Sequence, residues 1–307
     1  MRKRKNSLKK VISVSDKLTQ DQIIEQLVQE NNKVEPKYKV KRQDTGLGRV
    51  YRWDDEGGAA DIYSVTTVLN VLDKGIGFHK WLGNSPSYEM AMDYGNQRAE
   101  LGTMVHAFCS MLSWGMEVNT NNGWEDRNFV KHPVPDEAKK RLLGFIDYFK
   151  DERPVMLASE IMLFNPKRVY PSNEKGKDSY LQYPFAGTAD MIYVKPNDNK
   201  PEVVLCDIKT GKEYPKSHAL QLTAYKLLWD SLYGDEQGHI QTLKCLYLKG
   251  NGKYKLVELP FVPEAFYQCV SMFEFNSTTL KTGKWPTIKD KKELPNVFSL
   301  DMEMEES

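Results

Sequence analysis

The chain has 307 residues, of which 40% are apolar and 28% are charged, as is typical of a soluble globular protein with one large domain or two modest ones. Its formal net charge of +1 excludes an overall basic field for nucleic acid, although the first ten residues are mostly basic and the last seven are rich in acids. No apolar run is long enough to cross a membrane.

The cysteines and the N-terminus bear on metal content and location. Cys109, Cys206, Cys245 and Cys269 are widely spaced and form no C-x-x-C, so neither a zinc site nor an iron–sulfur site is supported. Free thiols predict a reducing cytoplasm. Because the first fourteen residues lack acids, mitochondrial and nuclear targeting stay open alternatives.

The N-terminal half predicts a hairpin and several helices. After a basic arm and a short helix at 17–29, two strands at 49–53 and 62–65 enclose a D-D-E-G-G turn. Ser64 then precedes an apolar helical pattern, where it would cap a helix N-terminus suited to a DNA phosphate; a plain N-cap is the alternative. The other elements predicted here are helices from about 86, at 102–114 and at 136–150, and a polar loop at 119–135.

The C-terminal half predicts most of the sheet. A strand at 155–164 carries Glu160 in its middle, where a charged residue is unexpected. Glu160 is either a functional residue or an outward-facing residue of a half-buried strand. A polar loop with four basic residues follows at 166–182. The other predicted elements are strands at 183–194, 202–209, 242–247 and 254–259, and helices at 217–232 and 263–282.

This order of elements predicts an α/β fold, with a mixed central sheet flanked by helices and a helical N-terminal part. We divide the chain into an arm with a short helix at 1–45, a main domain at 46–285 and a surface extension with an acidic tail at 286–307.

Two acids and a lysine lie on elements that otherwise resemble core. Asp207 and Lys209 are two apart, so in a strand they point to one face, and Asp190 lies beside another apolar run. A buried carboxylate is costly unless it is paired or binds a metal. The alternative is that D-x-K is a common surface pair, and a lone histidine such as His106 is more often a satisfied core residue than a ligand.

Five segments, in this order, resemble the active-site motifs of the PD-(D/E)XK nuclease superfamily, and most closely its RecB-like exonuclease branch. They are G-T-M-V-H ending at His106, the in-strand Glu160, G-T-A-D ending at Asp190, D-I-K-T-G starting at Asp207 and Q-L-T-A-Y starting at Gln221. S-V-T-T-V-L from Ser64 also resembles the opening of phage exonucleases and of the mitochondrial genome-maintenance exonuclease. The likeness covers about residues 60–230 and implies a restriction-endonuclease-like core.

The resemblance implies a role for each matched residue. One or two Mg²⁺ or Mn²⁺ ions would be held by His106, Glu160, Asp190, Asp207 and the backbone carbonyl of Ile208. The implied catalytic set is Asp190, Asp207, Lys209, Glu160, Gln221 and Tyr225, in which Lys209 positions or deprotonates the attacking water. The residues expected to contact DNA are Ser64, Thr66, Thr67, Arg98, Thr210 and Tyr225.

The expected function is a metal-dependent DNA exonuclease that acts on free ends, prefers single strands and serves recombination, repair or replication. The resemblance to small stand-alone nucleases implies the cytoplasm of a bacterium or of a phage-infected host cell. The alternatives are a duplex-degrading nuclease similar to lambda exonuclease, and a non-catalytic DNA-binding module on the same fold. DNA is the expected partner, with a helicase, a single-strand-binding protein or an annealing protein as further candidates and no membrane. Ser110 stands where many relatives carry an acid, and the cysteines that hold an iron–sulfur cluster in some relatives have no counterpart, so no cluster is expected.

Overall fold

The computed structural model describes residues 19–45, 48–55, 58–126, 129–166, 185–195 and 201–277. The basic arm up to residue 18, nearly all of the predicted loop at 166–182 and the extension at 286–307 lie outside the described residues.

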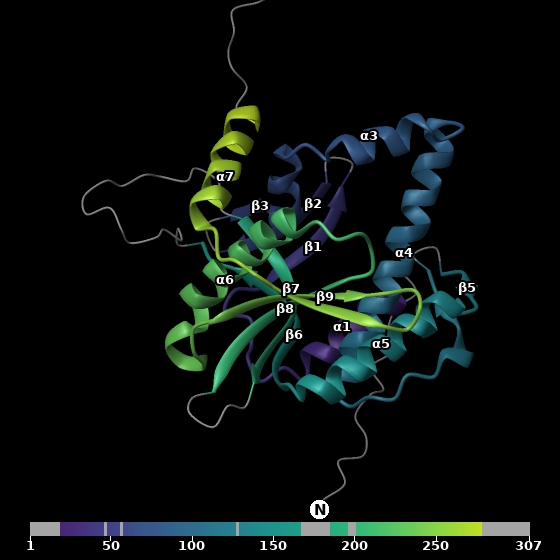
Figure 1. Ribbon diagram of the computed structural model, residues 1–307. Coiled ribbons are helices and arrows are strands. Elements are labelled where there is room, and N and C mark those ends of the chain that lie inside the picture. Colours follow the sequence, from purple (N-terminus) through teal and green to yellow (C-terminus); the bar gives the residue numbers. More distant parts are fainter. Residues whose placement is uncertain are drawn as a thin grey trace, which may run out of the picture.

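A mixed sheet of eight strands forms the centre of the molecule, in the order β1-β2-β3-β7-β8-β9-β10, with β6 paired to β7 (Figure 1). The parallel pairs are β3 with β7 and β8 with β9, and the others are antiparallel. The strands are β1 Val40–Thr45, β2 Gly48–Asp55, β3 Gly58–Ser64, β6 Val155–Phe164, β7 Phe185–Lys195, β8 Glu202–Lys209, β9 Thr242–Leu248 and β10 Tyr254–Leu259.

Helices cover both faces of this sheet and give three layers. Figure 1 shows α6 and α7 on one side and α4 and α5 on the other. One core cluster joins the sheet to α2, α6 and α7, and the second joins it to α1, α4 and α5. The helices are α1 Gln20–Gln29, α2 Val65–Val68, α3 Ile76–Gly83, α4 Tyr88–Ser113, α5 Asp136–Glu152, α6 Pro215–Gln237 and α7 Pro263–Ser277, and a 3₁₀ turn, η1, spans Leu69–Val71. The predicted α/β class with a mixed, helix-flanked sheet is therefore confirmed.

Strands β7 and β8 are buried on both faces, which explains why their sequences are nearly continuous apolar runs. The same runs carry the two acids that the sequence singled out. Most of the predicted strands and helices agree with the structure to within a few residues at their ends, which is the usual uncertainty of an element boundary.

Strand β7 has two different partners along one of its edges. Its other edge pairs with β6 over nearly its whole length. On the first edge, Phe185 and Ala186 pair with β3, whereas residues 191–195 pair with β8. Residues 187–190 therefore lie at a fork, where β8 leaves β7 and stays paired with β9 as far as Lys209.

Three sequence predictions need correction. Strand β1 was not predicted, because V-K-R-Q-D-T is mostly polar and owes its conformation to pairing with β2. The stretch expected as a plain loop at 119–135 contains a small hairpin, β4 Trp124–Glu125 with β5 Lys131–His132. The two helices expected on either side of Gly102 form one helix of 26 residues, α4. A β-carbon at Gly102 would lie 3.3 Å from the hydroxyl of Thr210, so a small residue suits the place where α4 passes the end of β8.

Within the part of the chain that the structure describes, no helix combines the length and the apolar character that a bilayer crossing needs.

Helices α4 and α5 are joined by a network of two arginines and one glutamate. Arg98 donates to both carboxylate oxygens of Glu137, at 2.7 and 2.8 Å, and Arg141 donates to the same carboxylate at 2.6 Å. These two guanidinium groups lower the pKa of Glu137 from 4.5 to about 2. A bidentate pair fixes geometry as well as charge, so the network sets the position of α4 relative to α5.

We expect Glu137→Gln to lower the free energy of unfolding at neutral pH by about 1 kcal/mol, a modest value because the carboxylate is more than one-third exposed. Since the pKa is lowered on folding, this contribution is full above about pH 4.5 and is lost as the pH falls towards 2. Urea denaturation of both proteins at several pH values measures the difference. Asp136→Asn, in the same first turn of α5, is the control, and an equal loss in both variants would contradict this account.

Candidate active site

Three acids lie opposite one another on the adjacent strands β6, β7 and β8. In β6, Ser159 pairs with Met191 and Ile161 with Ala189, so Glu160 stands opposite Asp190. In β8, Cys206 pairs with Met191, and continuing this register by one residue places Asp207 opposite Asp190. The row crosses the sheet at the fork of β7, so acids that are 47 positions apart in the sequence come together there.

Glu160 has a left-handed backbone conformation, with φ of 47°. An L-residue that is neither Gly, Asn nor Asp rarely adopts this conformation, which costs on the order of 1–3 kcal/mol. The neighbouring residues of β6 continue the ladder with β7 on both sides, so the surrounding sheet imposes the conformation. Such strain is common where a side chain is aimed at a functional site.

Asp190 is held in place from two sides. Its Oδ2 accepts a hydrogen bond of 2.6 Å from the backbone N–H of Ile208, which takes the place of a ladder bond where β7 and β8 separate. Its Oδ1 lies 3.4 Å from Nδ1 of His106, a residue of α4. The backbone carbonyl of Asp190 accepts a 3.0 Å hydrogen bond from the hydroxyl of Ser159. The carboxylate thus has a fixed direction before anything binds.

His106, Glu160 and Asp190 form a compact set of donor atoms. One ligand atom from each lies within 4.8 Å of the others, and His106 Nδ1 is 3.9 Å from Glu160 Oε1. Two carboxylates and one imidazole at this spacing fit a divalent cation, because oxygen ligands suit Mg²⁺ and Mn²⁺ and an added imidazole favours Mn²⁺. The residues present therefore fit the metal that the sequence implied.

Asp207 belongs to a second group of side chains beside this set. Its Oδ2 lies 2.6 Å from Nζ of Lys209, and its Oδ1 accepts a 3.3 Å hydrogen bond from Nε2 of Gln221. Gln221 also accepts from Lys209 Nζ at 3.1 Å and donates to the hydroxyl of Tyr225 at 3.0 Å. Asp207 and Lys209 share a face, as the sequence predicts, and the amide of Gln221 fixes the position of both.

Burial and neighbouring opposite charges shift the pKa values of His106, Asp190, Asp207 and Lys209 in opposite directions. Burial lowers the pKa of His106, but Asp190 and Glu160 outweigh it and raise that pKa to about 9. Burial raises the pKa of Asp207 to about 6, even though Lys209 acts in the other direction. Burial also opposes the charged forms of Asp190 and Lys209, yet His106 lowers the pKa of Asp190 and Asp207 raises that of Lys209. The cluster is therefore a set of buried charges that stabilise one another.

The structure gives local partners to most of the residues predicted to contact DNA, and their role stays a prediction. Ser64 caps α2 by accepting from the Thr67 N–H at 3.0 Å, and its hydroxyl lies 2.8 Å from that of Thr66, so the plain N-cap is present in the structure. Arg98 is engaged with Glu137 in the network described above. Thr210 directly follows β8, next to α4.

Gly187 is a site residue that the sequence analysis quoted without giving it a role. A β-carbon at this position would lie 2.2 Å from Cε1 of Tyr225, so only glycine lets the tyrosine ring lie against β7. Thr188, next to it, shares a 2.8 Å hydrogen bond with the hydroxyl of Tyr51 on β2. The sequence shows this glycine in G-T-A-D, three residues before the acid. The reason for a glycine there is its contact with Tyr225, which depends on where α6 packs.

The sequence matches the model of the PD-(D/E)XK nuclease superfamily over residues 81–286, which is more than half of the chain. The chain therefore belongs to this superfamily, and the restriction-endonuclease-like core that the resemblance implied is confirmed.

Two solved structures are similar to this chain at low sequence identity. The structure titled SSO0001 shares 15% identity, covers 45% of this chain and 57% of its own, and gives a TM-score of 0.26. The alkaline exonuclease LHK-Exo from Laribacter hongkongensis shares 12% identity, covers 70% of this chain and 87% of its own, and gives a TM-score of 0.32. The match thus spans just over half of the first protein. No match was found among curated proteins.

We expect Glu160→Gly to leave the free energy of unfolding of the metal-free protein unchanged or to raise it by about 1 kcal/mol, because glycine adopts this conformation without strain. Glu160→Ala removes the same carboxylate but keeps a β-carbon, so it should be less stable than the glycine variant by about 1 kcal/mol. Urea denaturation in EDTA compares the two. An alanine variant at least as stable as the glycine variant would show that the backbone at Glu160 is not strained.

Proposed function

We propose that this protein is a metal-dependent DNA exonuclease that hydrolyses phosphodiester bonds from free ends and prefers single-stranded DNA. One observation carries the proposal: the donor set of His106, Glu160 and Asp190 lies beside a lysine ammonium that Asp207 and Gln221 hold in place. This combination is what phosphodiester hydrolysis needs, and the superfamily supports it.

His106, Glu160 and Asp190 would bind the cation, with Asp207 and the backbone carbonyl of Ile208 as the further ligands that the resemblance implies. A divalent ion held there would lower the pKa of a water that it binds and would stabilise negative charge on the phosphate and the leaving oxygen. Glu160 and Asp190 are the acids best placed for this role, since each offers an oxygen within 4.8 Å of the imidazole donor.

Lys209 would act on the water and on the phosphate. Its ammonium is half-buried and is held between Asp207 Oδ2 at 2.6 Å and Gln221 Oε1 at 3.1 Å, which leaves a third N–H to donate. That donor would orient the attacking water or bind a non-bridging phosphate oxygen. Tyr225 keeps Gln221 in the required orientation through the hydrogen bond to its amide.

The preference for single strands is supported by exposed aromatic and methionine side chains on α3 and the first half of α4. Tyr88 and Tyr94 are 65% and 54% exposed, and Trp81 lies between the rings of Phe78 and Tyr94, with centroid distances of 5.5 and 6.4 Å. Figure 1 shows this part of the chain projecting beyond the sheet. Unpaired bases stack on such side chains, whereas a duplex hides its bases.

The direct test is degradation of end-labelled single- and double-stranded DNA with Mg²⁺, Mn²⁺ or EDTA. We expect loss of the single-stranded label with either metal and none in EDTA. Lys209→Ala and Asp207→Asn should each slow degradation at least about 100-fold, the usual contribution of a group that moves or positions a proton. Lys253→Ala, an exposed lysine in the β9–β10 turn, is the matched control and should keep full activity.

Two results would contradict the proposal. If the wild type binds DNA but cuts no substrate with either metal, the protein is a non-catalytic DNA-binding module. If Lys209→Ala cuts as fast as the wild type, the reaction occurs at a different site.

A further inference from the structure

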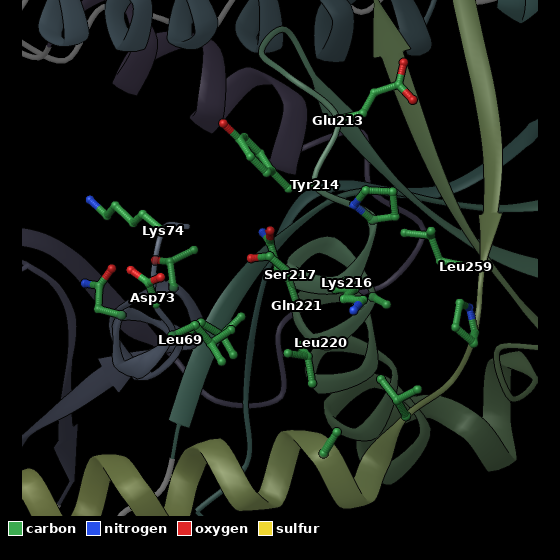
Figure 2. A pocket seen from close by; sticks show the side chains of 18 of the residues that line it. Leu69, Asp73, Lys74, Glu213, Tyr214, Lys216, Ser217, Leu220, Gln221 and Leu259 are labelled. Carbon is green, nitrogen blue, oxygen red and sulfur yellow. The ribbon is translucent and has the colours of Figure 1, made fainter. Parts of the chain in front are cut away.

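A deep groove runs beside the active site on the α6 face of the sheet. Its volume is ≈ 1050 Å³, at the upper end of the range for small-molecule pockets. It lies between the segment from Thr66 to Phe78 on one side and the start of α6 with the β10–α7 connection on the other. Figure 2 shows Leu69, Asp73 and Lys74 facing Ser217, Gln221 and Leu220 across it.

Gln221 connects the groove to the catalytic residues Asp207 and Lys209. This residue lines the groove and also holds Lys209 at 3.1 Å and Asp207 at 3.3 Å. A ligand in the groove is therefore one side chain away from the lysine that would act on the phosphate. The groove extends the active site: Thr66 and Gln221 belong to the residues that the motifs identified, and the rest of its lining does not.

Much of the groove's lining is apolar, and aromatic rings stand at its rim. The apolar lining includes Leu69, Leu72, Leu220, Leu259 and Val262. Tyr214 at the N-terminus of α6 and Phe78 of α3 line the groove, and Tyr214 is 50% exposed. Such a surface accepts flat, weakly polar rings, and the hydroxyls of Thr66 and Ser217 offer hydrogen bonds to their edges.

The charges of the rim favour an anionic ligand. Both carboxylate oxygens of Glu213 are paired, with Lys249 and Lys255 at 2.6 Å each, and Asp73 lies 2.8 Å from His79. Lys74 and Lys216 line the same rim and are exposed. Apolar side chains and aromatic rings in the groove, with ammonium groups at its rim, match a nucleotide, which combines a base with a phosphate.

We propose that this groove binds unpaired nucleotides of the DNA strand next to the phosphate that is cut, with Tyr214 stacking on a base and Lys74, which lies over the Phe78 ring, and Lys216 contacting the flanking phosphates. The inference rests on the proposed nuclease function and adds the part of the substrate that the site recognises. It also provides a physical reason for single-strand preference, because a base paired in a duplex cannot enter the groove.

The test is binding of a fluorescein-labelled oligothymidylate, measured by anisotropy in EDTA so that no cleavage occurs. Tyr214→Ala should weaken binding about tenfold, which corresponds to the loss of one stacked base. A second oligonucleotide with abasic positions should bind the wild type more weakly, yet bind Tyr214→Ala and the wild type nearly equally. Phe275→Ala removes a similarly exposed ring from α7 that does not line the groove, and it should change neither affinity.

Lys216→Glu, at an exposed position, is a second variant that does not depend on a buried side chain. It should weaken binding and reduce the dependence of affinity on salt concentration. If the wild type cuts DNA but both variants bind the oligothymidylate as tightly as the wild type, the groove does not hold the strand and the nuclease proposal stands. If the wild type neither cuts nor binds DNA, both proposals fail.

Discussion

The structure depends on placing three carboxylates opposite one another in a largely buried row. Like charges at this distance repel, and burial adds a desolvation cost, so the row is stable only with compensating cations. His106 and Lys209 supply that compensation in the protein alone, from opposite faces of the sheet. They balance the acids well enough for folding and still leave oxygen atoms that a divalent ion can bind.

The fork in the sheet makes this row possible. If β7 paired with β8 along its whole length, the backbone around Asp190 would be closed by ladder bonds and little space would remain for a ligand. Because β3 replaces β8 at the other end of β7, residues 187–190 are released from that edge and Asp190 turns its carboxylate towards the N–H of Ile208. α4 then supplies His106 from one layer, and α6 supplies Gln221 and Tyr225 from the other.

Most strands of the central sheet and the identity of the acids could be predicted from the sequence, because buried strands leave long apolar runs in which a carboxylate is conspicuous. The mostly polar strand β1 could not. The register between strands could not be predicted, because it depends on which strands pair. This register places Glu160 opposite Asp190. The left-handed backbone at Glu160 and the need for glycine at Gly187 are likewise imposed by neighbouring elements. The groove could not be predicted from the sequence either, because three segments that are distant in the chain form it and none of them has an unusual sequence.

The most direct test of the central claim is an anomalous difference map from crystals soaked in MnCl₂, measured near the manganese absorption edge. The account predicts a peak within coordination distance of His106, Glu160 and Asp190, and its loss in Asp190→Asn crystals soaked in the same way. A fully occupied manganese site elsewhere on the described residues, with no density at this cluster, would show that the row of acids is not a metal site.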